Sequence, residues 1–352
     1  MSQIFLPPFN STSYNLNFNS LALLGSFLEK IRMIPPSTTV SEVLKDDRQL
    51  KSLMGLGRES FEKLLQEFTA LLKGNQLKNR RIKPKQYRKR KIGGGCKLAL
   101  GLPENQLFFI LFYLKNYPTY DVLAFTFNIS RGCACESVQR LLLLLKKAQK
   151  NLNVLPKRTT DNPQELLQRI EKFDHILIDA TERPIQRPQQ SARQKKHYSG
   201  KKGLHTVKNT TVSDLKKCIL ILGKTVPGSQ HDYSQFKEEF NPETHWFQTT
   251  KVSVDLGYQG IKKDYLSSEQ IQIPHKKPRK SKNNPHPQLT RKQRQENRKI
   301  GRVRVAVEHA IGGMKTFRVL TIRLRTRLKH FADDFIFVAA GLWNLKNSFV
   351  VQ

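Results

Sequence analysis

Three acidic side chains occur in settings where they could bind metal ions together. Asp179 follows the apolar run at 176–178 and Asp255 follows the β-branched run at 252–254, so both are expected at the ends of buried strands. Glu308 lies within an apolar pattern of helical spacing. Asp179 alone is better explained as the cap of a turn, but the repeat at Asp255 and the added glutamate reverse that preference. Together they offer the oxygen ligands that two Mg²⁺ ions, about 4 Å apart, would need.

The elements that must position these acids can be outlined from the periodicity of the chain. Around the strands that end at Asp179 and Asp255, the sequence predicts further strands at 204–212, 217–222 and 271–273 and helices at 233–240 and 302–315. The last of these helices carries Glu308. Strands and helices are interspersed, so the second half of the chain is expected to be α/β.

Upstream, residues 103–147 have the pattern of a helix-turn-helix unit. The sequence predicts helices at 107–114, 120–127 and 137–147. Thr119 is expected to cap the second helix. Arg140 is a candidate for contacting DNA from the third helix, whereas Cys133 and Cys135 are expected in the preceding turn, where they are unusual.

The chain resembles the DDE-type transposases of bacterial insertion sequences, most closely the IS-five group, from about residue 100 to its end. Three matching stretches contain the acids: I-L-I-D-A-T-E-R-P around Asp179, V-S-V-D-L-G-Y-Q-G around Asp255, and R-V-R-V-A-V-E-H-A-I-G-G-M-K around Glu308. Three more are H-Y-S-G-K-K from His197, H-T-V-K-N from His205, and P-G-S-Q-H-D ending at Asp232. All six occur in the order of the family.

This resemblance implies a fold and an activity. The fold is an RNase H-like catalytic domain at 171–352, a mixed sheet flanked by helices, preceded by an all-α helix-turn-helix domain at 101–150. The activity is that of a metal-dependent DNA endonuclease and transposase that binds the ends of an insertion sequence and carries out strand cleavage and strand transfer. Asp179, Asp255 and Glu308 would be the catalytic residues and would hold two Mg²⁺ ions, for which Mn²⁺ could substitute.

The resemblance also implies roles for residues around the acids. Glu182 and Arg183 are expected either to support the metal ligands or to contact DNA. His231 is expected to orient a phosphate or a water, or to make a structural hydrogen bond, with Asp232 beside it. Arg304 and Lys315 match a Y-x2-R-x3-E-x6-K pattern, in which Gly301 takes the place of the tyrosine. The residues expected to contact DNA are Arg88, Lys89, Arg90, Lys91, Arg140, Lys201, Lys202, Arg304 and Lys315.

The composition points to a polyanionic partner. The formal net charge is +34 over 352 residues, which points to a polyanion. The resemblance implies that this partner is double-stranded DNA, both element ends and target. The four cysteines show neither a disulfide framework nor a zinc-binding spacing, and no apolar run approaches the ~20 residues of a membrane helix. We therefore expect a cytoplasmic protein without membrane association. The resemblance implies in addition a bacterial, nucleoid-associated protein that acts as a homo-oligomer on DNA.

Two stretches of the chain are rich in Lys and Arg. Residues 1–75 are expected to form a poorly ordered start and a small helical region, and 76–100 a basic flexible linker, since nine of the fourteen residues at 78–91 are Lys or Arg. At 276–304, twelve basic residues occur against one acid. This second stretch is expected to be a loop that lies over the substrate and becomes ordered on DNA.

Two other functions remain open on sequence grounds. One is a domesticated or inactive DNA-binding relative without catalysis, and a more distant one is an RNA-processing nuclease. Carboxylates at all three positions favour the enzyme, because acids in a basic surface weaken DNA binding and a simple binding protein has no need of them.

Overall fold

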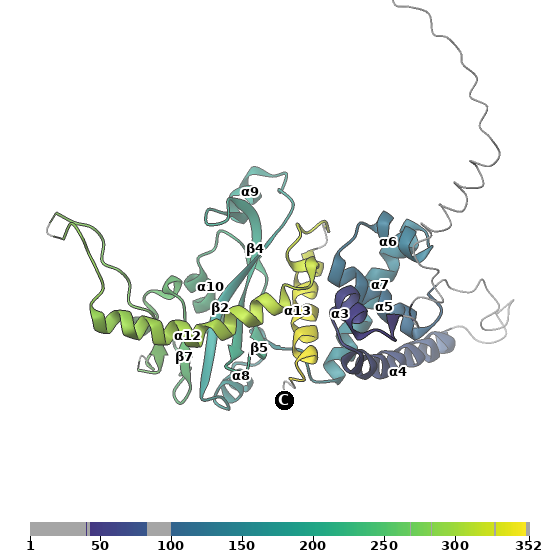
Figure 1. The fold of residues 1–352 in the computed structure, drawn as a ribbon, viewed down its shortest axis with the longest axis horizontal. Helices are drawn as coiled ribbons and strands as arrows, with labels where there is room; N and C mark the ends of the chain where they lie inside the picture. The colour runs from purple at the N-terminus through teal and green to yellow at the C-terminus, as the bar shows by residue number, and fades with distance from the viewer. Residues whose placement is uncertain are drawn as a thin grey trace, which may run out of the picture.

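The structure is a computed structural model of the chain, and it describes residues 40, 43–82, 100–267, 269–282, 284–326 and 329–349. Its N-terminal part is helical and its C-terminal part contains a mixed sheet flanked by helices (Figure 1). The predicted fold class, an RNase H-like domain preceded by a helical domain, is therefore confirmed. Within the described ranges, no helix is long and apolar enough to span a membrane.

The sheet is organised around β2 (His175–Pro184). This strand pairs antiparallel with β4 (Leu204–Asp214) over nearly its whole length and parallel with β7 (Lys251–Ser253) over its first residues only. The order across the sheet is β1-β5-β4-β2-β7-β8, where β1 is Lys157–Arg158, β5 is Ile219–Leu222 and β8 is Ile271–Gln272. Short strands β3 (Tyr198–Ser199) and β6 (Val226–Pro227) also pair with β4. The antiparallel set β5-β4-β2 followed by parallel β7 and β8 is the RNase H-like order.

Helices cover both faces of this sheet because successive residues of β2 point to opposite sides. Ile176 and Ile178 belong to a core formed with α8 (Pro163–Ile170), α10 (Asp232–Glu239) and α11 (Ile261–Asp264). Leu177 faces the other way and packs on Val307 and Ile311 of α12 (Arg291–Met314). The long helix α12 therefore crosses the opposite face of the sheet and brings its own side chains to β2 and β7 (Figure 1).

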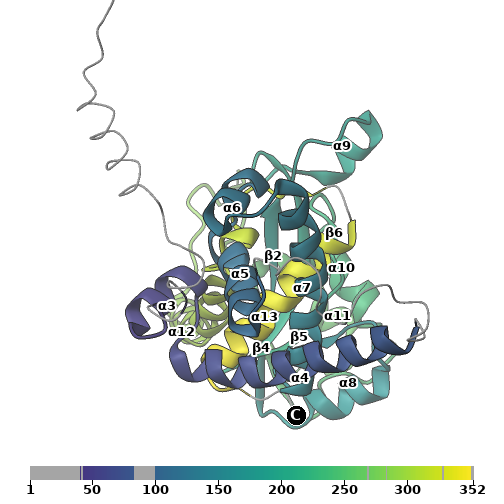
Figure 2. The same ribbon diagram turned by 90° about the vertical axis from the view of Figure 1, so that its right-hand side faces the viewer.

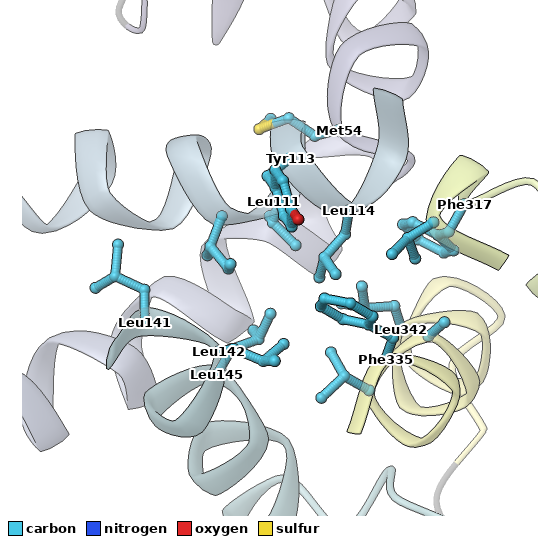
Figure 3. Close-up of a cluster of buried hydrophobic side chains, with 14 of the residues drawn as sticks. Met54, Leu111, Tyr113, Leu114, Leu141, Leu142, Leu145, Phe317, Phe335 and Leu342 are labelled. Carbon is cyan, nitrogen blue, oxygen red and sulfur yellow. The ribbon is translucent and has the colours of Figure 1, made fainter. Parts of the chain in front are cut away.

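The N-terminal helices share one core, which continues into the C-terminal part through residues such as Val207, Ile219 and Met314. It contains residues of α3 (Asp47–Met54), α4 (Arg58–Ile82), α5 (Pro103–Asn116), α6 (Tyr120–Phe127) and α7 (Arg131–Asn151). Met54, Leu114 and Leu142 meet there with Phe335 of α13 (Lys329–Lys346) and with Phe317, which precedes the short helix η3 (Arg318–Leu320) (Figure 3). The C-terminal helix is thus part of the core of the N-terminal helices.

Helix α13 joins the two parts of the molecule (Figures 1 and 2). On one side, Asp334 accepts a 2.6 Å hydrogen bond from Lys146 of α7. On the other side, the buried Asn344 accepts a hydrogen bond from the backbone of Ile219 and donates to the carbonyls of Ile219 and Val154. Amide groups of this kind fix the direction and register of a helix, because each unpaired buried polar group is costly.

Several predicted boundaries agree with the structure and others need correction. The second helix of the helix-turn-helix unit spans Tyr120–Phe127 with Thr119 as its cap, as predicted. The third begins at Arg131, capped by Ser130, so Cys133 and Cys135 lie in its first two turns and not in the preceding turn.

The two basic stretches also differ from expectation. Helix α4 continues to Ile82, so the predicted start of the linker at 76 falls inside a helix. The predicted residues Arg88, Lys89, Arg90 and Lys91 lie outside the described residues. In the second stretch, α12 begins at Arg291 and not at 302, because Thr290 and Gln293 form a reciprocal capping box there.

Candidate active site

Asp179 lies in the middle of β2 and not at its end as predicted. The strand continues to Pro184 because β4 pairs with it that far, whereas its parallel neighbour β7 stops at Ser253. The pairing of Leu177 with Ser253 places Asp179 and Asp255 level with each other on adjacent chain segments. Asp255 then caps the short helix η2 (Leu256–Tyr258), its carboxylate accepting a 2.7 Å bond from the next backbone N–H. The two aspartates are neighbours, as predicted, although Asp179 lies within its strand and not at the end of it.

Arg304 of α12 lies between these two carboxylates. Its Nη1 is 3.3 Å from Oδ1 of Asp255 and its Nη2 is 3.8 Å from Oδ2 of Asp179. The arginine side chain is only 13% exposed, so solvent screens these contacts less than those of a surface ion pair. In the structure Arg304 balances the charge of the two aspartates. Its predicted contact with DNA stays a prediction.

The carboxyl group of Asp179 is electrostatically unusual. Burial raises its pKa to about 6, and the negative charges of Asp255 and Asp232 act in the same direction. A hydrogen bond from the backbone N–H of Ala180 and the charge of Arg304 oppose this rise only in part. A carboxylate that is costly to keep ionised is typical of sites built to receive a positive charge.

A second set of charges is centred on Lys208 of the neighbouring strand β4. Lys208 of β4 is nearly fully buried and contacts Asp232 at 2.7 Å and Glu182 at 3.6 Å. Glu182 also accepts a 2.9 Å hydrogen bond from Thr206. Lys208 was not among the site residues predicted from the sequence. The signal was available, because Lys208 lies in the matched stretch H-T-V-K-N and faces Glu182 in the strand register.

Two buried polar atoms near the aspartates have no partner among the described residues. They are Nε of Arg304 and the hydroxyl of Tyr258, which is 1% exposed. Burial, followed by the negative charge of Asp179, raises the pKa of Tyr258 well above its ordinary value. Most buried polar groups are satisfied, so these two indicate a site whose hydrogen bonding is completed by a bound group.

Glu308 is not gathered with the two aspartates. It lies one helical turn after Arg304 on α12, and its side chain is exposed. Among the described residues, no three His, Cys, Asp or Glu side chains come close enough to hold a metal ion. The structure thus brings two of the three predicted acids together and places the third on the helix that crosses them.

Lys315 lies at the C-terminal end of α12 and close to the carboxylate pair. Burial lowers its pKa, as does the nearby charge of Lys202, while Asp179 and Glu182 act in the opposite direction. Lys201 and Lys202 are exposed in the turn between β3 and β4. Lys202 and Lys315 therefore lie at the edge of the site, where a phosphate could be held.

Two predicted residues have structural roles in this state. Arg183 is 0% exposed and donates hydrogen bonds to Asn209, Thr225 and the carbonyl of Ala332, so it cannot contact DNA from this position. His231 is exposed and caps α10, its Nδ1 accepting the N–H of Tyr233 at 3.3 Å. For His231, this is the structural alternative that the sequence left open.

The helix-turn-helix unit presents part of α7 to solvent. Arg140 and Gln139 are exposed, and the guanidinium of Arg140 donates to the side chain of Gln106 at 3.4 Å. Ser137, a further polar residue of this helix, is buried and faces the core. The exposed surface of α7 is thus narrower than its polar sequence suggests.

The fold and these residues together define a class of protein. A sheet of RNase H-like order with two adjacent aspartates, preceded by a helix-turn-helix unit, is the arrangement of a nucleic-acid-processing nuclease. The model of the family described as DDE superfamily endonuclease matches residues 178–344, and that of the helix-turn-helix of DDE superfamily endonuclease matches residues 99–150.

A relative extends the match over most of the chain. A protein of Microchaete diplosiphon, described as a probable transposase for insertion sequence element IS702, is 30% identical over 297 residues, which cover 84% of this chain and 94% of that protein. The chain belongs to the DDE-type transposases of insertion sequences. Its assignment to the IS-five group stays a prediction. No solved structure matches the chain.

Proposed function

We propose that this transposase binds the ends of its element as a homo-oligomer and catalyses metal-dependent strand cleavage and strand transfer with Asp179, Asp255 and Glu308. The observation that carries the proposal is the pair of level aspartates that share Arg304. Two carboxylates held this close repel each other unless a positive charge lies between them. Here the charge comes from the guanidinium, and in catalysis it would come from metal ions.

The residues present fit divalent metal ions. The donor set is entirely carboxylate oxygen, which Mg²⁺ and Mn²⁺ prefer. The raised pKa of Asp179 and the unpartnered hydroxyl of Tyr258 indicate a site that is incomplete without a further group. Asp179 and Asp255 would hold the ions and Glu308 would complete the set. When bound, two such ions activate a water or a DNA 3′-hydroxyl and stabilise the departing oxygen.

The residues of the chain itself have separate tasks in this mechanism. Arg304 contacts both aspartates, so its guanidinium balances their charge and would compete with a cation held by the same two carboxylates. Lys208 contacts both Glu182 and Asp232 and so holds these two acids beside each other. Lys202 and Lys315 would bind the phosphates beside the scissile bond, since both cations lie at the edge of the site.

The alternative is a DNA-binding relative that has lost catalysis. The carboxyl of Asp179 argues against it, because a side chain whose ionisation is penalised by burial weakens the folded protein without helping DNA binding. A protein selected only for binding gains nothing from keeping it.

The test pairs a metal-binding measurement with a cleavage assay. Asp179→Asn, Asp255→Asn and Glu308→Gln should each abolish nicking of the element's end DNA and weaken Mn²⁺ binding in calorimetry, while DNA affinity in a gel shift stays equal or rises. Ca²⁺ should support binding without nicking. Glu171→Gln, which changes an exposed acid at the C-terminal end of α8, is the matched control and should cut normally.

Two results would contradict the mechanism. One is nicking that persists in chelator. The other is normal cutting by the Asp255 or Glu308 variant, which would show that the site lies elsewhere. Glu182→Gln should lose activity only in part, because Glu182 is held by Lys208 and Thr206 on the neighbouring strand.

A further inference from the structure

Helix α12 consists of two halves with different surroundings. All of its buried residues lie in the C-terminal half: Val307, Ala310, Ile311 and Met314. Between Arg291 and Ala306 no side chain is buried. Figure 1 shows this N-terminal half extending past β7, beyond the strands of the sheet. This half of the helix contributes no buried side chain to a core, so tertiary packing of an apolar face does not explain why it is helical.

The N-terminal half carries a dense set of unpaired cations. Arg291, Lys292, Arg294, Arg298, Lys299 and Arg302 are all exposed, and among the described residues none of these six side chains forms a hydrogen bond or an ion pair. Spacings of four residues bring Arg294 next to Arg298, and Arg298 next to Arg302. Like charges at this spacing destabilise a helix. An ordinary solvated helix would intersperse acids, whereas here the only acid is Glu296.

The chain nevertheless holds this half in place. Glu296 binds His275 at 2.5 Å, and Asn297 both accepts from the backbone N–H of His275 and donates to its carbonyl. Thr290 and Gln293 close the helix start with a capping box. Glu296 thus holds the helix against the preceding loop through His275, and the six cations face solvent.

We propose that the N-terminal half of α12 is a preformed DNA-backbone binding surface, formed by those six cations. The proposal rests on the proposed function, because the scissile phosphate is taken to lie at Asp179 and Asp255. The same helix carries Arg304 at those carboxylates. The duplex therefore runs from the site outward along α12, and sequence-independent contacts to phosphates hold it there.

The helix sets the extent of this contact. At 1.5 Å per residue, the thirteen steps along the helix from Arg304 back to Arg291 span roughly 20 Å. At 3.4 Å per base pair this corresponds to about 6 base pairs of duplex on one side of the scissile phosphate. The surface is already helical without DNA, so binding needs no folding of this segment, in contrast to the loop expected from the sequence.

The salt dependence of binding tests the surface directly. The triple variant Arg294→Gln, Arg298→Gln, Arg302→Gln removes three of the six cations, and affinity for a duplex of about 30 base pairs is measured against salt. The slope of log K against log salt should fall by about 2 to 3 and affinity should drop at least about tenfold, since each lost phosphate contact lowers the slope by about 0.9. Replacing the same three by Lys should restore the slope.

A matched control separates location from net charge. Lys172, Lys216 and Lys251 are exposed at the opposite end of the sheet, where β2 and β7 begin. Their triple change to Gln removes the same charge and should leave the slope within about 0.5 of wild type. Circular dichroism should show equal helix content in both variants. An unchanged slope in the α12 variant, or an equal fall in the control, would overturn the proposal.

Footprinting then locates the contact. Hydroxyl-radical protection by wild type should extend about 6 base pairs to one side of the nick, and the α12 Gln variant should lose that segment only. Protection that is the same in both proteins would refute the proposed path. The salt dependence of binding is measured without metal or cleavage. The proposed α12 surface can therefore be refuted while the carboxylate mechanism is supported, and the mechanism can be refuted while the surface is supported.

Discussion

The raised pKa of Asp179 makes a prediction about folding stability. An acid with a folded-state pKa of about 6, against an ordinary value of 3.8, keeps its proton in the folded protein while the unfolded chain has already released it. Ionisation therefore destabilises the folded state progressively as the pH rises from about 4 to above 6. Asp179→Asn, which cannot ionise, should remove this penalty. In the metal-free protein the variant should be more stable than wild type.

The magnitude follows from the two pKa values. At pH 8 the penalty is up to about 3 kcal/mol, because each pKa unit corresponds to about 1.36 kcal/mol. At pH 4.5 the group is mostly protonated in the folded state, and the penalty is only about 1 kcal/mol. The side chain is 24% exposed, so solvent screening does not remove the effect.

Urea unfolding in chelator at both pH values measures the difference. The gain from Asp179→Asn should be larger by about 2 kcal/mol at pH 8 than at pH 4.5. Asp121→Asn, whose side chain is 73% exposed, should show no comparable pH-dependent gain. Adding Mg²⁺ should then stabilise wild type relative to the variant, through binding to the folded state alone. A gain that does not vary with pH, or a loss at pH 8, would refute the reasoning.

Two further predictions concern packing and charge. Gly312→Ala should stabilise the protein by about 0.5–1 kcal/mol, since nothing lies within 4 Å of the added carbon. Gly313→Ala should instead cost about 1–3 kcal/mol, because there the added carbon would meet the Trp343 ring at 2.0 Å. Urea unfolding measures both changes, and equal effects would contradict the close packing of α12 on α13. Lys208→Met should cost about 3 kcal/mol, because Asp232 then loses its cation and Glu182 keeps only its hydrogen bond from Thr206. The double variant with Asp232→Asn should recover part of this loss, and a cost below about 1 kcal/mol for the single variant would contradict the buried role of Lys208.

Much of the fold could be predicted because it rests on local patterns. The second helix of the helix-turn-helix unit was bounded by its cap at Thr119, and the strand before Asp179 by its apolar run. What the local pattern could not show was where pairing stops. β2 continues past Asp179 because β4 supplies a partner as far as Thr206, and that partner is distant in sequence.

The candidate site also contains features that the sequence could predict and features that it could not. The identities of Asp179 and Asp255 were recognisable from strand patterns and family motifs, and the register of β2 and β7 brings them together. The position of Arg304 between them depends on the direction of one side chain from a helix fifty residues further on. Burial of Lys208 and Arg183 likewise depends on the helices packed against the sheet. Composition alone would place both cations on the surface.

Helix α13 explains how the two parts of this transposase are fixed relative to each other. Phe335 lies in the core of the helix-turn-helix part, while Asn344 binds strand β5 and Trp343 packs against Gly313 of α12. One rigid helix thus contacts the DNA-binding helices, the sheet and the helix that carries Arg304. The distance from α7 to the carboxylates is therefore set by packing and not by linker length. DNA that contacts α7 and the aspartates of one molecule must bridge a fixed separation.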